Sequence, residues 1–172
     1  MQSVLTVCQG KTGREWFEMT GPQPVFSMVN IAGKIEEERE AVATGKLRLK
    51  KRTIDRMRGR KIEKGDPLAA AEIAAILAAK KTSELIPLCH PIPITEVKAV
   101  GKVADDGVMV EVVVKSKGRT GVEMEALVAA SMYLLTVWDM TKQYEKDKNG
   151  QYPFTAIDQI RIRRKVKKHV RG

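Results

Sequence analysis

The chain has 172 residues, and its 43% of apolar residues is enough to bury the core of one domain. No apolar run reaches the ~18 residues of a membrane-spanning helix, and the first residues lack the apolar stretch of a secretory signal, so we expect a cytoplasmic protein. The net charge of +10 is concentrated: residues 46–64 hold ten Lys and Arg against two acids, and residues 161–171 hold seven against none. These segments favour phosphates, nucleotides or nucleic acid as ligands, with plain solvated surface charge as the alternative.

The N-terminal half is predicted to contain an arm, a strand and two helices. Residues 1–26 form the irregular arm, which the Gly-Pro-Gln-Pro sequence at 21–24 interrupts, and residues 27–172 form a single domain. Residues 45–51 alternate leucine with basic residues, which is typical of a half-buried strand. A short basic helix follows over 53–62. A second helix starts at Asp66-Pro67, with Asp66 as N-cap and Pro67 in the first turn, and runs through residues 69–81.

The C-terminal half completes a recognisable order of elements. Strands are predicted over 94–103 and 108–115, joined by a hairpin turn at Asp105-Asp106-Gly107. A long helix covers 122–146, a loop 148–153 and a last strand 157–166. The order strand–helices–strand–strand–helix–strand is that of a ferredoxin-like α+β fold with a split βαβ topology, in which helices cover one face of an antiparallel sheet.

This topology makes the first and last strands neighbours. The basic residues of the two strands are then expected side by side, and like charges opposed across strands destabilise a sheet. Such an arrangement needs an anion, or an acidic surface from another subunit. The residues concerned are Lys46, Arg48 and Lys50 on the first strand and Arg161, Arg163 and Lys165 on the last.

The long helix has two faces that both favour burial. One face, expected to pack on the sheet, carries Leu127, Ala130, Leu134, Val137, Trp138 and Thr141. The other carries Val128, Met132 and Leu135 together with Glu125 and Asp139, and we expect a second copy of the chain to cover it. An exposed scatter of apolar residues is the alternative.

The spacing of two acids on this helix predicts a shared site. Glu125 and Asp139 are fourteen residues apart, which is about 21 Å along a helix axis. One compact pocket cannot use both from the same helix. Two antiparallel copies would bring one copy's Glu125 near the other's Asp139, so we predict a site between subunits.

A stiff loop at residues 85–93 presents one cysteine and one histidine. Its three prolines restrict the backbone, which favours a role for Cys89 and His90 in contacting a substrate. A structurally satisfied histidine is the alternative. No second His/Cys cluster completes a tetrahedral metal site, and the two cysteines, Cys8 and Cys89, show no disulfide spacing, which suits a reducing compartment.

Two further groups of residues can carry chemistry. The glycines at 118 and 121 let a ligand approach the start of the long helix, whose N-terminus favours anions. Glu123 and Glu125 in its first turn can also simply complement the helix dipole. Asp139 and Lys142 are an ordinary surface pair, or, if a partner covers them, a pair that exchanges protons.

Four segments in register resemble the family of cyclic pyranopterin monophosphate synthase, the molybdenum-cofactor biosynthesis protein C family. The resemblance spans about residues 27–168 and implies a ferredoxin-like subunit in a homohexamer, a trimer of dimers with shared sites. It also implies conversion of 3′,8-cyclo-7,8-dihydro-GTP into cyclic pyranopterin monophosphate with release of pyrophosphate. The segments are Lys64-Gly65-Asp66, residues 85–91, residues 120–127 and residues 139–142.

The resemblance also implies roles for particular residues. Asp139 and Lys142, joined by Lys64, are expected to be catalytic; the substrate-binding set is Leu88, Cys89, His90, Glu123, Met124, Glu125, Arg39 and Lys165. No resident metal or cofactor is expected, with Mg²⁺ carried by the triphosphate left open. The chain departs from the family pattern at Asn30, which receives no role, and at residues 166–169, which stand in place of a Gly/Ser-rich segment with lysine.

The main alternative is a basic ferredoxin-like module that binds RNA. Such a module stacks bases on aromatic residues of its sheet, and the predicted strands contain no Phe, Tyr or Trp. A purely structural or regulatory subunit would leave His90 and Asp139 without a role. We therefore expect a small-molecule substrate and a second copy of the chain as partners, and neither nucleic acid nor a membrane.

Overall fold

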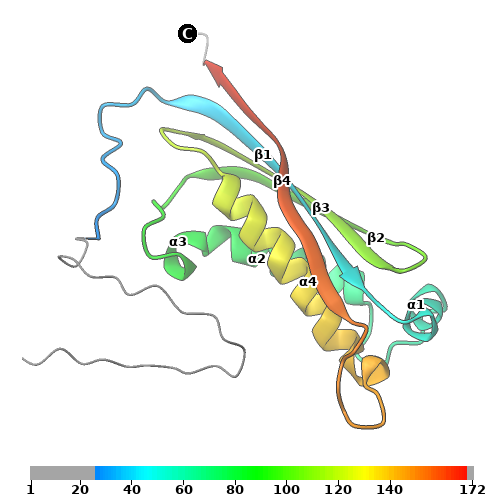
Figure 1. The fold of residues 1–172 in the computed structure, drawn as a ribbon. Helices are drawn as coiled ribbons and strands as arrows, with labels where there is room; N and C mark the ends of the chain where they lie inside the picture. The colour runs from blue at the N-terminus through cyan, green and yellow to red at the C-terminus, as the bar shows by residue number, and fades with distance from the viewer. Residues whose placement is uncertain (1–25, 170–172) are drawn as a thin grey trace, which may run out of the picture.

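The structure is a computed structural model that describes residues 26–169 (Figure 1). The predicted arm lies outside the described residues apart from Phe26, so the division into an arm and one domain stays a prediction. The elements of the described part are β1 (Glu37–Arg48), α1 (Lys51–Arg58), α2 (Pro67–Lys80), α3 (Thr82–Leu85), β2 (Ile94–Val103), β3 (Gly107–Gly118), α4 (Glu123–Glu145) and β4 (Ala156–His169).

The four strands form one antiparallel sheet in the order β2-β3-β1-β4. This confirms the predicted ferredoxin-like α+β fold, including the contact between the first and last strands. Figure 1 shows α2 and α4 side by side along one face of the sheet, with α3 and the start of α4 at one end and α1 at the other. The loop before β2 and the start of α4 therefore meet at one end of the domain.

The first strand begins eight residues earlier than predicted, at Glu37 rather than at residue 45. Its first half is rich in Glu and Ala, which have low strand propensity. Pairing with β3 on one side and β4 on the other holds this segment in the sheet, and Ala41 and Ala43 are fully buried. Helix α1 (Lys51–Arg58) begins two residues earlier and ends four residues earlier than the helix predicted over 53–62. It ends at Arg58 because Gly59 follows and the φ of Arg60 is +54°, which is not helical.

The prediction that basic residues of β1 and β4 oppose one another is wrong for residues 46–50. Lys46 lies opposite Asp158 and forms an ion pair of 2.5 Å with Asp106. Arg48 pairs with Asp158 at 2.8 Å. Bulges in the pairing of β1 with β4, between 42 and 43 and between 44 and 46, set this register, and acids of the chain itself neutralise the strands.

The core lies between the sheet and the helices α2 and α4. Fully buried residues of α4 include Ala126, Ala130, Tyr133, Leu134 and Val137, so the predicted stripe is largely confirmed, although Leu127 and Trp138 are only partly buried. The second apolar face of α4 is only partly covered within the chain: Val128 and Met132 are half-buried, and 49% of Leu135 is exposed.

A buried carboxylate fastens the end of α4 to two other parts of the chain. Glu145 is fully buried and accepts hydrogen bonds from the Lys50 backbone N–H at 3.1 Å and from the hydroxyls of Thr53 and Thr155. The Lys50 ammonium donates to the carbonyl of Glu145. These bonds join α4 to the start of α1 and to the segment before β4.

Candidate active site

A pocket of about 450 Å³ lies between the loop before β2 and the start of α4. Prolines 87, 91 and 93 keep the loop out of regular structure, and a turn bond from the Cys89 N–H to the Ile86 carbonyl (3.0 Å) shapes it. The pocket brings together six of the predicted site residues: Leu88, Cys89, His90, Glu123, Met124 and Glu125.

Glu125 is the unusual group of this pocket. It is 3% exposed, and its Oε2 finds no hydrogen-bond partner among the described residues. Burial, reinforced by the charge of Glu123, raises the pKa of Glu125 above its ordinary value. Burial and the neighbouring Glu125 also raise the pKa of the Cys89 thiol, which does not favour an activated nucleophile there.

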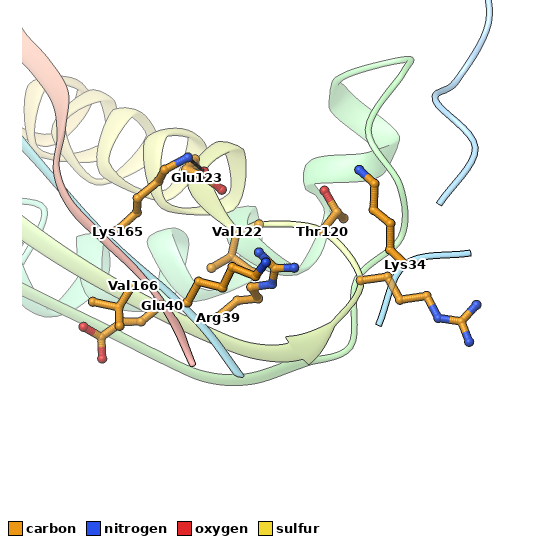
Figure 2. A pocket seen from close by; sticks show the side chains of 11 residues that line it. Lys34, Arg39, Glu40, Thr120, Val122, Glu123, Lys165 and Val166 are labelled. Atoms are coloured by element: carbon orange, nitrogen blue, oxygen red, sulfur yellow. Dashed lines mark hydrogen bonds and ion pairs between the residues drawn. The ribbon is translucent and has the colours of Figure 1, made fainter. Parts of the chain in front are cut away.

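A second pocket of about 440 Å³ adjoins the first and shares Lys34, Thr120, Gly121 and Glu123 with it (Figure 2). Its walls come from β1, from the segment between β3 and α4, and from β4. Five cations and two acids, Glu40 and Glu123, line it, and the excess of positive charge favours an anion. These cations are Lys34, Arg39, Arg119, Lys165 and Lys167.

Gly121 allows Glu123 to stand between the two pockets. A Cβ at position 121 would lie 1.9 Å from Oε2 of Glu123, so a side chain there would displace that carboxylate. In the structure the carboxylate accepts a hydrogen bond of 3.0 Å from the Lys165 ammonium, and the two side chains meet at the start of α4 in Figure 2. Despite burial, Lys165 holds the pKa of Glu123 below its ordinary value.

The three predicted catalytic residues form a separate cluster near the other end of α4. Asp139 accepts from Lys142 at 2.7 Å and from Lys64 at 2.8 Å. Lys142, and then Lys64, lower the pKa of Asp139 to about 2, and Asp139 in turn raises the pKa of Lys142. Gly65, with a φ of +97°, makes the turn that carries the chain from Lys64 to Asp66.

The two groups of predicted site residues do not meet within one chain. The fourteen residues from Glu125 to Asp139 lie in the single helix α4, so the two ends are about 21 Å apart along its axis. The side chain of Asp139 is 56% exposed, and it lines neither pocket. A compact site using all these residues needs a second copy of the chain.

Residues 26–169 contain no group of three or more His, Cys, Asp or Glu that could hold a metal ion. In the same part of the chain, no helix combines the length and apolar character needed to cross a membrane. None of the four strands carries Phe, Tyr or Trp, so the sheet offers no aromatic platform for stacking bases.

The sequence profile of the MoaC family matches residues 28–168. This chain belongs to the MoaC family. The match spans every helix and strand from β1 onward except the last residue of β4, and it includes all the predicted site residues.

Curated relatives of this MoaC-family chain are identical to it at about half of the aligned positions. A protein of Sulfolobus acidocaldarius named "Probable cyclic pyranopterin monophosphate synthase" is 52% identical over 83% of this chain and 99% of its own length. A protein of Thermococcus kodakarensis with the same name is 53% identical over 81% of this chain and 90% of its own. A protein of Methanothermobacter thermautotrophicus is 50% identical over 81% of this chain and 88% of its own length, and it is named "Probable cyclic pyranopterin monophosphate synthase accessory protein".

The structure adds pocket residues that sequence reasoning missed. Lys34, Arg119 and Lys167 line the basic pocket beside the predicted Arg39 and Lys165. Arg119 lies between Gly118 and Gly121, in the segment where a ligand was predicted to approach the helix, so its basic side chain could have been predicted to line an anion site. Lys34 is the last residue of the turn at 31–34. Lys167 depends on the register of β4 against β1, which is set by bulges that the sequence does not reveal.

Proposed function

We propose that the chain is a cyclic pyranopterin monophosphate synthase of molybdenum cofactor biosynthesis. It converts 3′,8-cyclo-7,8-dihydro-GTP into cyclic pyranopterin monophosphate and releases pyrophosphate. Membership of the MoaC family and the names of the curated relatives support this reaction. The observation that carries it is the joined pocket, in which a buried carboxyl group with one unpartnered oxygen adjoins a wall that holds five cations.

The two halves of the pocket suit the two halves of such a substrate. A ring system rich in N–H groups fits against the free oxygen of Glu125, with Leu88, Cys89, His90 and Met124 as the surrounding wall. A triphosphate fits the cationic half, where Arg39 and Lys165 stabilise the charge of the leaving pyrophosphate. Mg²⁺ accompanies the triphosphate as part of the substrate and needs no resident metal site.

Asp139, Lys142 and Lys64 carry the proton transfers. Opening the imidazole ring and closing the pyran ring both move protons, which a positioned ammonium donates and a positioned carboxylate accepts. A second copy supplies these residues to the pocket of the first, in a homohexamer built as a trimer of dimers. The exposed apolar face of α4, with Leu135 at its centre, supports this assembly. The enzyme works in the cytoplasm, with no membrane or nucleic-acid partner.

The test is turnover by the purified chain. With the cyclised GTP intermediate as substrate, the wild type releases pyrophosphate and forms the pterin product, and Asp139→Asn lowers the rate by about 100-fold or more. Asp105→Asn is the matched control, because Asp105 is an exposed acid that pairs with Arg58 far from the site.

Three results would contradict the proposal. The first is equal activity of the Asp139 and Asp105 variants. The second is salt-sensitive RNA binding without turnover, which favours the RNA-binding alternative. The third is turnover that requires another protein, which favours an accessory role like the one in the name of the Methanothermobacter relative.

A further inference from the structure

Two like charges are opposed at the wall of the basic pocket. Arg39 on β1 is paired in register with Lys167 on β4, and both side chains line the pocket. Side chains of directly opposed residues project from the same face of an antiparallel sheet, and like charges there destabilise it. Something must neutralise this pair when no anion is bound.

Glu37 supplies the neutralising charge. It lies two residues before Arg39, so both side chains project from the same face of β1. Its carboxylate contacts the Arg39 guanidinium at 2.6 Å, the Lys167 ammonium at 3.1 Å and Nδ1 of His169 at 3.0 Å. Burial alone would raise the pKa of Glu37, but these three neighbours hold it below the ordinary value, so the group is an anion.

The position of Glu37 is unusual for a carboxylate. The same face of β1 carries the fully buried Ala41, Ala43 and Leu47 farther along, where the helices cover it. The side chain of Glu37 is only 3% exposed, behind the cations that face the pocket. Nε of Arg39 is buried and has no partner in the described part of the chain, so Glu37 does not occupy every donor of the guanidinium.

We propose that Glu37 is the internal counter-ion of the basic pocket: it holds Arg39 and Lys167 together in the empty site and competes with phosphate groups for them. The Glu37 carboxylate thereby stabilises the empty site and lowers its affinity for the bound anion. This inference rests on the proposed function for the identity of the phosphate compound, pyrophosphate being its product. The effect is to let a pocket with five lining cations release that product.

The test compares two neighbouring glutamates by the binding of inorganic pyrophosphate to the full chain, measured by calorimetry. Removing one negative charge beside a multiply charged anion strengthens binding, and we expect Glu37→Gln to bind pyrophosphate about tenfold more tightly than the wild type. Glu38→Gln is the matched control, because Glu38 is exposed on the opposite face of β1. Its affinity should stay within about twofold of the wild type.

The rise in Tm that pyrophosphate produces is a second readout that a purely structural role of Glu37 would not change. In buffer, Glu37→Gln should melt below the wild type, because Arg39 and Lys167 then repel each other. Pyrophosphate should raise its Tm more than that of the wild type, since the anion replaces the missing carboxylate. If this variant does not fold, Lys167→Gln takes its place, and it should bind pyrophosphate about fivefold more weakly.

Three results would overturn the inference. The first is unchanged or weaker pyrophosphate binding by a folded Glu37→Gln variant, and the second is an equal effect of Glu38→Gln. The third is unchanged pyrophosphate binding by Lys167→Gln. These measurements need no turnover. If the chain binds pyrophosphate as described but does not convert the cyclised intermediate, the proposed function is contradicted and the counter-ion role of Glu37 still holds.

Discussion

Glu125 and Asp139 are two carboxyl groups on one helix whose pKa values are displaced in opposite directions. Burial raises the pKa of Glu125, and two lysines lower that of Asp139 to about 2. Such divergence is common where an active site needs one carboxyl group as an acid and another ionised. Asp139 is the ionised group and orients two ammonium groups, whereas the buried Glu125 favours its neutral form more than an exposed glutamate does.

Replacement of Glu125 by Gln should stabilise the protein in a pH-dependent way. The folded-state pKa lies above the unfolded value near 4.5, so ionisation of Glu125 lowers the stability of the fold as pH rises through this range. The amide resembles the neutral acid and removes that loss. Thermal unfolding should give Glu125→Gln a higher Tm than the wild type at pH 7, with the difference shrinking toward pH 4. A difference in Tm that does not change with pH would contradict a raised pKa of Glu125 in the folded state.

Gly121→Ala should impair binding with little effect on stability. The new Cβ would displace the Glu123 carboxylate from its place beside Lys165. We expect KM for the cyclised intermediate to rise about tenfold, the equivalent of ~1.4 kcal/mol, with the Tm nearly unchanged. Gly33→Ala is the control, because nothing lies within 4 Å of a Cβ there. Equal KM values for both variants would show that the position of Glu123 is unimportant.

At the scale of the elements, the part of the sequence with local signals predicted the structure well. The hairpin of β2 and β3 follows its Asp-Asp-Gly turn, and α2 begins after Asp66, which accepts from the N–H groups of Leu68 and Ala69. The start of β1 and the register of β4 were not predictable. The first depends on partner strands on both sides, and the second on bulges that no local pattern reveals.

The same division explains how much of the candidate site could be predicted. Residues that lie close in sequence, such as Leu88 to His90 or Met124 and Glu125, enter the pocket as expected. Lys167 and its counter-ion Glu37 become neighbours only through the pairing of β1 with β4. Their roles stay predictions until the binding measurements are made.

Glu145 should contribute more to stability than any exposed acid of α4. Truncation by Glu145→Ala leaves the Lys50 N–H and the hydroxyls of Thr53 and Thr155 without their acceptor. We expect a loss of about 2–3 kcal/mol in the free energy of unfolding by urea. Glu63→Ala, an exposed glutamate nearby, should cost under about 0.5 kcal/mol. Similar losses in both variants would mean that the buried bonds contribute little.

At the scale of the whole molecule, the candidate site residues of one chain form two separate groups. The joined pocket lies at the start of α4 and the Asp139 cluster toward its end. The apolar outer face of the helix lies between them, and it is only partly covered within the chain. An antiparallel pair of α4 helices would cover that face and complete two sites at once, which links assembly to catalysis.

Complementation between two inactive variants tests this arrangement directly. Glu125→Gln and Asp139→Asn each damage every site of a uniform assembly, so each alone should release little pyrophosphate from the cyclised intermediate. In a co-expressed mixture, half of the dimers carry one variant of each kind, and one of their two sites is intact. The mixture should then regain about a quarter of the wild-type rate. A mixture no more active than its two components would contradict a site shared between subunits.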